Sequence, residues 1–304
     1  MKKFFIFMFL IITTLSLASC GNVKVENEVK IITPYGTPYL ALGGLLDEEN
    51  VKIDAVNGAD GLKTALVKGE YDVVVAPINL GAQLFNKGNS KYVIEAVITM
   101  NNAYIITENG NKLDSIKDLE GQNVLGFGQT GIPGSVLKTL YTNNDLDQSL
   151  IDFSQASSSA VYSIFAGGSS GAKYALMSEP EISKLVLNDK FEIKTLDLCK
   201  LLGVDVPQAC VYVNPSSNNL EEVNKVLSMI EANVKSLNEN TEAYVSSVIA
   251  LDRTFEATGE EVLIRSIPLS NITYKDAKNF KNEINNILTI LGVKAPNDEF
   301  YYQE

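Results

Sequence analysis

An apolar run at residues 71–76 constrains the fold of this chain more than any other feature. Its sequence, Tyr-Asp-Val-Val-Val-Ala, is typical of a strand that is buried on both faces of a sheet. Two further strands are predicted before it, at 29–33 and 51–55, with helices at 39–46 and 62–69 between the strands. The order strand, helix, strand predicts right-handed βαβ units, and therefore an α/β fold with mostly parallel sheets flanked by helices.

The same alternation continues through the middle of the chain. A helix is predicted at 157–165, where a serine-rich start suits a helix N-terminus. From residue 220 to the end, the pattern is mainly helical. Further strands are predicted at 92–99, 103–107, 123–127, 174–177 and 209–213.

The first nineteen residues have the layout of a secretion signal. Lys2 and Lys3 precede an apolar run from Phe4 to Leu17, and small residues follow. A membrane-spanning helix needs about 20 predominantly apolar residues, and this run is shorter. We therefore expect residues 1–19 to be removed on export and exclude them from the fold.

Cys20 directly follows Leu-Ala-Ser, and this tetrapeptide resembles the bacterial lipobox. The resemblance implies that the cysteine is acylated, with palmitate-like chains, and becomes the new N-terminus. Two or three acyl chains anchor a protein stably, whereas a single chain does so only marginally. We expect a lipoprotein on the extracytoplasmic face of the cell membrane, with residues 20–28 as a polar tether.

Length and composition narrow the classes of function. The chain has 304 residues, so even without the signal it exceeds the size of roughly 250 at which one core usually splits. Its net charge of −12 excludes a nucleic-acid binder, which would be basic. Histidine is absent, which removes histidine-dependent triads and most histidine-ligated metal sites. We expect neither a metal nor a cofactor.

Two cysteines, Cys199 and Cys210, lie in the expected mature chain beyond the lipidation site. Their spacing fits no zinc pattern. An exported protein can form a disulfide, and two structural thiols are an equally good interpretation.

Five segments in order over nearly the whole mature chain resemble the nitrate/taurine type of ABC-transporter solute-binding proteins, within the periplasmic-binding-protein type II superfamily. The segments are 61–72, 115–124, 157–180, 207–209 and 296–302. The resemblance implies a two-lobed fold with two chain crossovers, lobe I comprising 29–105 plus 211–304 and lobe II comprising 106–210. It also implies a small-molecule ligand in the interlobe cleft and an ABC permease with its ATPase as partner. We expect a monomer that is not an enzyme.

Ligands of open α/β sheets gather at the carboxyl ends of strands, and the turns there supply the candidate contacts. Gln129 to Gly131 open a helix whose free N–H groups favour an acceptor. The alternative role of Asn79 and Ser158 is that of a helix cap, and the segments at 35–37 and 100–102 are alternatively ordinary turns. Glu179 resembles a cleft-facing glutamate of the family, although Ser178 stands here where the family often has an aromatic residue. The candidate residues are Tyr35, Gly36, Thr37, Asn79, Met100, Asn101, Gln129, Thr130, Gly131, Ser158 and Glu179.

The ligand is expected to be neutral or cationic, and a flat heteroaromatic vitamin precursor suits these side chains. Arg253 and Arg265 are the only arginines, and neither is near a candidate turn in the sequence. Sulfonate capture favours arginine, so a sulfonate or nitrate-like anion is the alternative. The rival classes are an enzyme on the same fold and a lipid-anchored adhesion or sensor module.

Overall fold

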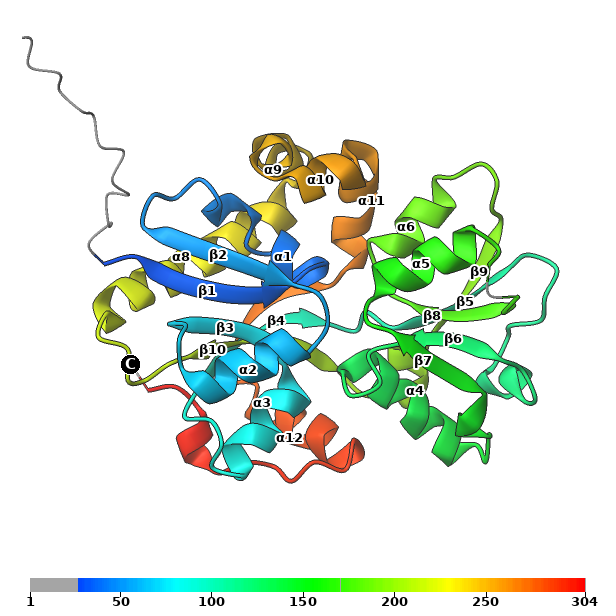
Figure 1. The fold of residues 1–304 in the computed structure, drawn as a ribbon, viewed down its shortest axis with the longest axis horizontal. Helices are drawn as coiled ribbons and strands as arrows, with labels where there is room; N and C mark the ends of the chain where they lie inside the picture. The colour runs from blue at the N-terminus through cyan, green and yellow to red at the C-terminus, as the bar shows by residue number, and fades with distance from the viewer. Residues whose placement is uncertain (1–26, 170, 304) are drawn as a thin grey trace, which may run out of the picture.

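The computed structural model describes residues 27–169 and 171–303, which form two lobes side by side, each a sheet flanked by helices (Figure 1). The two-lobed α/β architecture expected from the sequence is confirmed. The signal segment, Cys20 and the tether up to residue 26 lie outside the described residues. Within the described ranges, no helix has the length and apolar character needed to cross a membrane.

The first lobe is built on a six-stranded sheet in the order β11-β4-β10-β3-β1-β2. Strand β1 pairs in parallel with β2 and β3, whereas β10 and β11 run antiparallel to their neighbours. The strands are β1 (Val29–Pro34), β2 (Val51–Val56), β3 (Val73–Pro77), β4 (Val93–Met100), β10 (Pro207–Val213) and β11 (Ile272–Asp276).

The second lobe is built on a five-stranded sheet in the order β7-β6-β8-β5-β9. Strand β6 pairs in parallel with β7 and β8, and β5 pairs antiparallel with β8 and β9. The strands are β5 (Tyr104–Glu108), β6 (Val124–Phe127), β7 (Ile151–Gln155), β8 (Tyr174–Met177) and β9 (Ile193–Asp197).

Helices cover both faces of each sheet (Figure 1). Those of the first lobe are α1 (Thr37–Leu40), α2 (Asp60–Lys68), α3 (Ile78–Asn86), α8 (Leu220–Glu239), α9 (Thr241–Val248), α10 (Arg253–Thr258), α11 (Glu260–Leu269) and α12 (Lys281–Ile290). Those of the second lobe are α4 (Ile132–Asn143), α5 (Ser158–Ala166), α6 (Glu181–Val186) and α7 (Leu198–Leu202).

Strand β3 shows why the run at 71–76 is apolar throughout. Val73 and Val75 pack into the core that contains α8, whereas Val74 and Ala76 pack on the opposite face against α2, α3 and α12. All four side chains are fully buried. A strand with helices on both faces has no solvent side, so its sequence loses the polar alternation of a half-exposed strand.

The chain passes between the lobes twice, once between β4 and β5 and once between β9 and β10 (Figure 1). The expected boundaries at 105/106 and 210/211 each fall a few residues later than these crossings. Tyr104 and Ile105 already pair in the second sheet, and Pro207 already pairs in the first.

Three strands were not expected: β7, β9 and β11. The region after residue 220 was predicted to be mainly helical, but it also contributes β11 to the first sheet. The helix expected at 39–46 is shorter and earlier, since α1 ends at Leu40 and a single 3₁₀ turn, Gly43–Leu45, follows.

The two described cysteines are free and buried. Of the two interpretations left open by the sequence, structural thiols is the one that the structure bears out. Burial raises the pKa of the Cys199 thiol to about 12, and it raises the pKa of Cys210 as well. Both thiols therefore stay protonated and unreactive at neutral pH.

Candidate functional site

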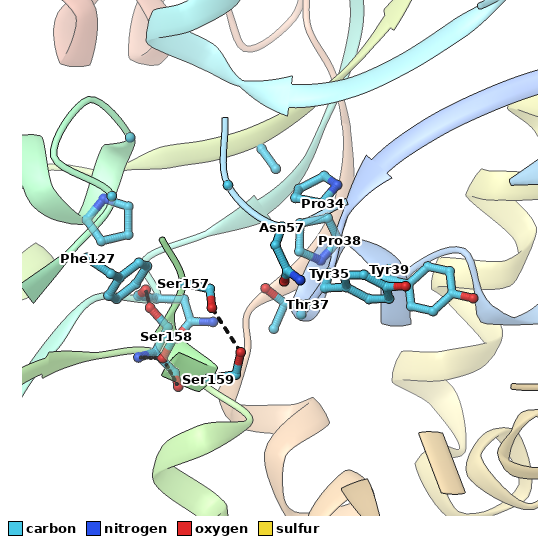
Figure 2. A pocket seen from close by; sticks show the side chains of 18 of the residues that line it. Pro34, Tyr35, Thr37, Pro38, Tyr39, Asn57, Phe127, Ser157, Ser158 and Ser159 are labelled. Carbon is cyan, nitrogen blue, oxygen red and sulfur yellow. Dashed lines mark hydrogen bonds between the residues drawn. The ribbon is translucent and has the colours of Figure 1, made fainter. Parts of the chain in front are cut away.

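A cavity of about 740 Å³ lies between the lobes, within the size range of small-molecule sites. It is lined by residues at the carboxyl ends of six strands: β1, β2 and β3 of the first lobe, and β6, β7 and β8 of the second. Figure 2 shows residues of the first lobe, among them Tyr35 and Asn57, across the cavity from Phe127 and Ser157 to Ser159 of the second. The carboxyl ends of the parallel strands thus meet at one site, as expected for open α/β sheets.

Most of the residues proposed from the sequence line this cavity. They are Tyr35, Gly36, Thr37, Gln129, Thr130, Gly131, Ser158 and Glu179. The other three, Asn79, Met100 and Asn101, do not.

An aromatic wall stands on the first-lobe side. Tyr35 is 41% exposed and meets Tyr39 edge to face, with ring centroids 5.5 Å apart. Tyr39 in turn packs against Phe255 at 5.1 Å, and its hydroxyl donates to the Asp252 carboxylate at 3.0 Å. The inner rings are therefore fixed, which leaves the exposed face of Tyr35 available to a flat ligand.

Gly36 lets the chain turn at the end of β1. Its φ of 95° lies in the region that favours glycine, and it precedes α1 directly. The turn brings Tyr35 and the buried Thr37 to the cavity wall.

The turn from Gly128 to Gly131 forms the wall on the second-lobe side. The Gly131 N–H donates to the Gly128 carbonyl at 2.8 Å, which closes the turn, and α4 starts at the next residue. No side chain caps this helix, so its first backbone N–H groups donate no hydrogen bond to a capping side chain. Gln129 and Thr130 are both exposed at the cavity.

Ser158 links two turns and does not cap its helix. The cap of α5 is Ser157, whose hydroxyl accepts from the Ala160 N–H. The Ser158 hydroxyl accepts from the Ser178 N–H at 3.0 Å, so it ties the start of α5 to the segment after β8. The cap interpretation of Ser158 is therefore wrong by one residue.

Asn102, at the first crossover, joins both lobes' strands at the base of the cavity. Its side-chain oxygen accepts from the Glu179 N–H at 2.8 Å, and its own N–H donates to the Gln208 side chain at 3.2 Å. Its carbonyl accepts from the Ser178 hydroxyl at 2.7 Å. The first of these hydrogen bonds holds Glu179 beside the crossover, and the other two tie the crossover to Gln208 and Ser178.

Two buried glutamates give the cavity a negative end. Glu179 accepts from the Ser183 N–H at 3.0 Å and is 5% exposed. Burial raises its pKa, and the hydrogen bonds from Ser183 and the charge of Arg265 oppose that rise. Burial likewise raises the pKa of Glu181, whose carboxylate pairs with Lys184 at 3.6 Å.

The fold thus places an arginine closer to the cleft than the sequence suggested. Arg265 on α11 does not line the cavity, but its charge reaches Glu179. Of the aspartate, glutamate, lysine and arginine side chains, those that line the cavity among the described residues are Asp60, Glu179, Glu181 and Lys184. An acidic excess favours a cationic over an anionic ligand.

Met100 and Asn101 belong to the crossover and not to the site. Met100 ends β4 and is buried in the core. Asn101 has a φ of 47°, and its side-chain oxygen accepts from the Val206 N–H at 2.8 Å, where the chain returns to the first lobe. Both residues were expected as ligand contacts, but Met100 packs in the core and Asn101 joins the two crossovers.

Several lining residues were not foreseen. The segment 57–60 follows β2, and Phe127 ends β6; each could have been found by applying the carboxyl-end rule to every predicted strand. Lys184 and Thr258 come from helices of opposite lobes. No local sequence signal marks them: Lys184 is on α6, which packs near α11 of the first lobe, and Thr258 ends α10, the helix before α11.

Among the described residues, no group of three or more histidine, cysteine, aspartate or glutamate side chains could hold a metal ion.

Comparisons with solved structures find the same two-lobed fold. An ABC transporter protein from Parabacteroides distasonis is 18% identical, with a TM-score of 0.73 over 92% of this chain and 100% of that one. The periplasmic aliphatic sulphonate binding protein SsuA from Escherichia coli is 11% identical, with a TM-score of 0.68 over 91% and 92%. The alkanesulfonate-binding protein SsuA from Xanthomonas axonopodis pv. citri, bound to MOPS, is 14% identical, with a TM-score of 0.68 over 90% and 95%.

The chain therefore has the two-lobed fold of periplasmic binding proteins. No family model matches the sequence, and no curated protein matches it either. At these identities, the likeness to solved structures establishes the fold, and the function has to be argued from the site.

Proposed function

We propose that this chain is the extracytoplasmic solute-binding component of an ABC importer, which captures a small molecule between its lobes and delivers it to a permease with its ATPase. One observation carries the proposal: the cavity of about 740 Å³ is lined from both lobes, at the carboxyl ends of six strands. Closure of two lobes around a ligand is the established motion of such receptors. The likeness to an ABC transporter protein and to two sulfonate-binding proteins supports it.

A binding role without catalysis agrees with the side chains at the cavity. The chain contains no histidine, and the two buried carboxylates, Glu179 and Glu181, already hold Ser183 and Lys184. A paired-carboxylate hydrolase would need one of them free to act as a general base.

We propose that the protein works as a monomer.

The ligand is proposed to be a neutral or cationic, flat heteroaromatic molecule. Tyr35 and Phe127 supply aromatic surface from opposite lobes (Figure 2), and the acidic residues outnumber Lys184. A sulfonate-like anion is the second candidate. The names of the Escherichia coli and Xanthomonas proteins favour it, and Lys184 with the uncapped start of α4 supplies positive potential.

Thermal-shift measurements with an aminopyrimidine, taurine and ethanesulfonate test the ligand class. At a hundredfold excess over Kd, a ligand adds about 2.7 kcal/mol to the stability of the folded state. For a chain of this size we expect the aminopyrimidine to raise Tm by roughly 5 °C and the sulfonates to leave it unchanged. Tyr35→Ala, which removes a half-exposed ring, should abolish the shift without lowering the Tm of the free protein.

Stabilisation by taurine or ethanesulfonate alone would contradict the heteroaromatic class and support the anion. Stabilisation by neither class, together with no small molecule found by mass spectrometry of the purified protein, would contradict the receptor function itself.

Anchoring through Cys20 is part of the same proposal and has its own test. The cysteine that follows Leu-Ala-Ser is the proposed acylation site. Cells fed labelled palmitate should incorporate label into the wild-type chain, and Cys20→Ser should lose all of it and appear in the soluble fraction. Cys199→Ser is the matched control because that thiol is buried in the fold. Equal labelling of the wild type and Cys20→Ser would refute the anchor.

A further inference from the structure

Asn79 makes a hydrogen bond between the lobes, a role that its position in the sequence did not suggest. It is the second residue of α3, in the first lobe, and it is 3% exposed. Its side-chain amide donates to the carbonyl of Thr130 at 2.8 Å, and Thr130 belongs to the turn before α4, in the second lobe. In Figure 1, α3 and α4 lie on the facing sides of the two lobes.

This asparagine does not stabilise its own helix. The N-cap of α3 is Pro77, without a side-chain cap, so the capping role considered from the sequence is wrong. In the described part of the chain, the side-chain oxygen of Asn79 is buried and has no hydrogen-bond partner. A buried polar atom without a partner costs free energy. The amide nitrogen of the same side chain donates to the opposite lobe, and that hydrogen bond offsets part of the cost.

The acceptor lies in a turn that forms part of the ligand cavity. Thr130 lines the cavity beside Gln129 and Gly131. Within the turn, the Gly131 N–H is already used by the Gly128 carbonyl. A donor from the opposite lobe therefore fixes the Thr130 peptide, and with it the wall of the cavity, only when the lobes are close together.

We propose that Asn79 is a positioning residue that fastens the turn at 129–131 over the cavity when the lobes close, so that this hydrogen bond couples lobe closure to the shape of the ligand site. The inference rests on the proposed receptor function, in which the lobes close around a ligand. Its test measures the distance between the lobes and needs no ligand, so the two proposals can fail separately.

Electron-spin distance measurements on the full chain would detect the open and closed populations. Spin labels are placed on exposed positions of the two lobes, through Lys63→Cys on α2 and Asn143→Cys on α4. Cys20→Ser removes the native thiol at the proposed acylation site, so that the labels attach to the two introduced cysteines. The native Cys199 and Cys210 are buried and should not react.

The informative variant is Asn79→Ala, and α3 offers a matched control. The side-chain amide of Asn86 also donates to a carbonyl, that of Lys294, at 2.6 Å, but donor and acceptor both lie in the first lobe. Loss of one net hydrogen bond should raise the ratio of open to closed molecules about two- to tenfold in Asn79→Ala. Asn86→Ala should leave the distance distribution unchanged.

Asn79→Asp provides a second variant of the same size, which lacks the donor and sets a carboxylate against the Thr130 carbonyl. It should open the lobes at least as far as alanine does. A distance distribution identical to that of the parent in both Asn79 variants overturns the proposal. So does an equal shift in Asn86→Ala, because that result would assign the effect to the helix and not to the bond between the lobes.

Discussion

Gly134→Ala is expected to destabilise the chain and to disrupt the cavity wall at the same time. Gly134 is the third residue of α4. A Cβ placed there would lie 2.8 Å from the carbonyl carbon of Gly128, closer still to its oxygen, and 3.0 Å from the Phe153 ring. Because the main obstacle is backbone, α4 or the turn has to move. Overpacking of this kind costs about 1–3 kcal/mol, occasionally more.

Gly131→Ala is the matched control in the same turn. Its Cβ would lie 3.4 Å from the Gly128 oxygen, an ordinary contact, and its φ of −81° suits any residue. Chemical denaturation should show a loss of stability in Gly134→Ala and little change in Gly131→Ala. Equal stability of the two variants would mean that the close approach of α4 to Gly128 does not exist in solution.

Residues next to strand ends were predictable, because one rule covers them all. Gln129 and Tyr35 were found from the sequence since the strands before them have a clear apolar pattern, and the turns after parallel strands meet at one edge. The segment at 57–60 obeys the same rule, since it directly follows β2. The rule identifies positions near the cleft, but it does not say which atoms a side chain will contact.

Asn79 illustrates that limit. Its place after β3 put it near the cleft, yet its partner is the Thr130 carbonyl, 51 positions away in the other lobe. Lys184 lies seven residues after the end of β8, on α6, which packs near α11 of the other lobe. Contacts between lobes depend on how two separately folded sheets meet, and no local pattern of residues encodes that geometry.

The three strands that the sequence did not predict, β7, β9 and β11, share a physical cause. Each lies at the edge of its sheet and has one neighbouring strand. Their side chains are mostly half-exposed or exposed, so few apolar residues are needed. A five-residue strand of this kind gives a much weaker signal than the fully buried β3.

The C-terminal motif at 296–302 has a structural role, and it leads to the second large prediction. Phe300 is fully buried, with its ring centroid 5.0 Å from that of Phe85 on α3 and 6.0 Å from that of Tyr212 on β10. Phe300→Ala should lower the free energy of unfolding by about 3–5 kcal/mol, because it removes a large buried ring and leaves a cavity. The measurement is chemical denaturation followed by tyrosine fluorescence and circular dichroism.

Tyr302→Phe separates this packing effect from a general effect of altering the chain terminus. The Tyr302 hydroxyl donates to the Asn224 side chain at 2.9 Å, and its N–H donates to the Ile94 carbonyl at 2.9 Å. Removing the hydroxyl alone should cost about 1 kcal/mol. Because Phe300 also supports α3, which carries Asn79, Phe300→Ala should in addition open the lobes under native conditions, whereas Tyr302→Phe should not. A loss of less than 1 kcal/mol in Phe300→Ala would show that the terminus is not part of the first-lobe core.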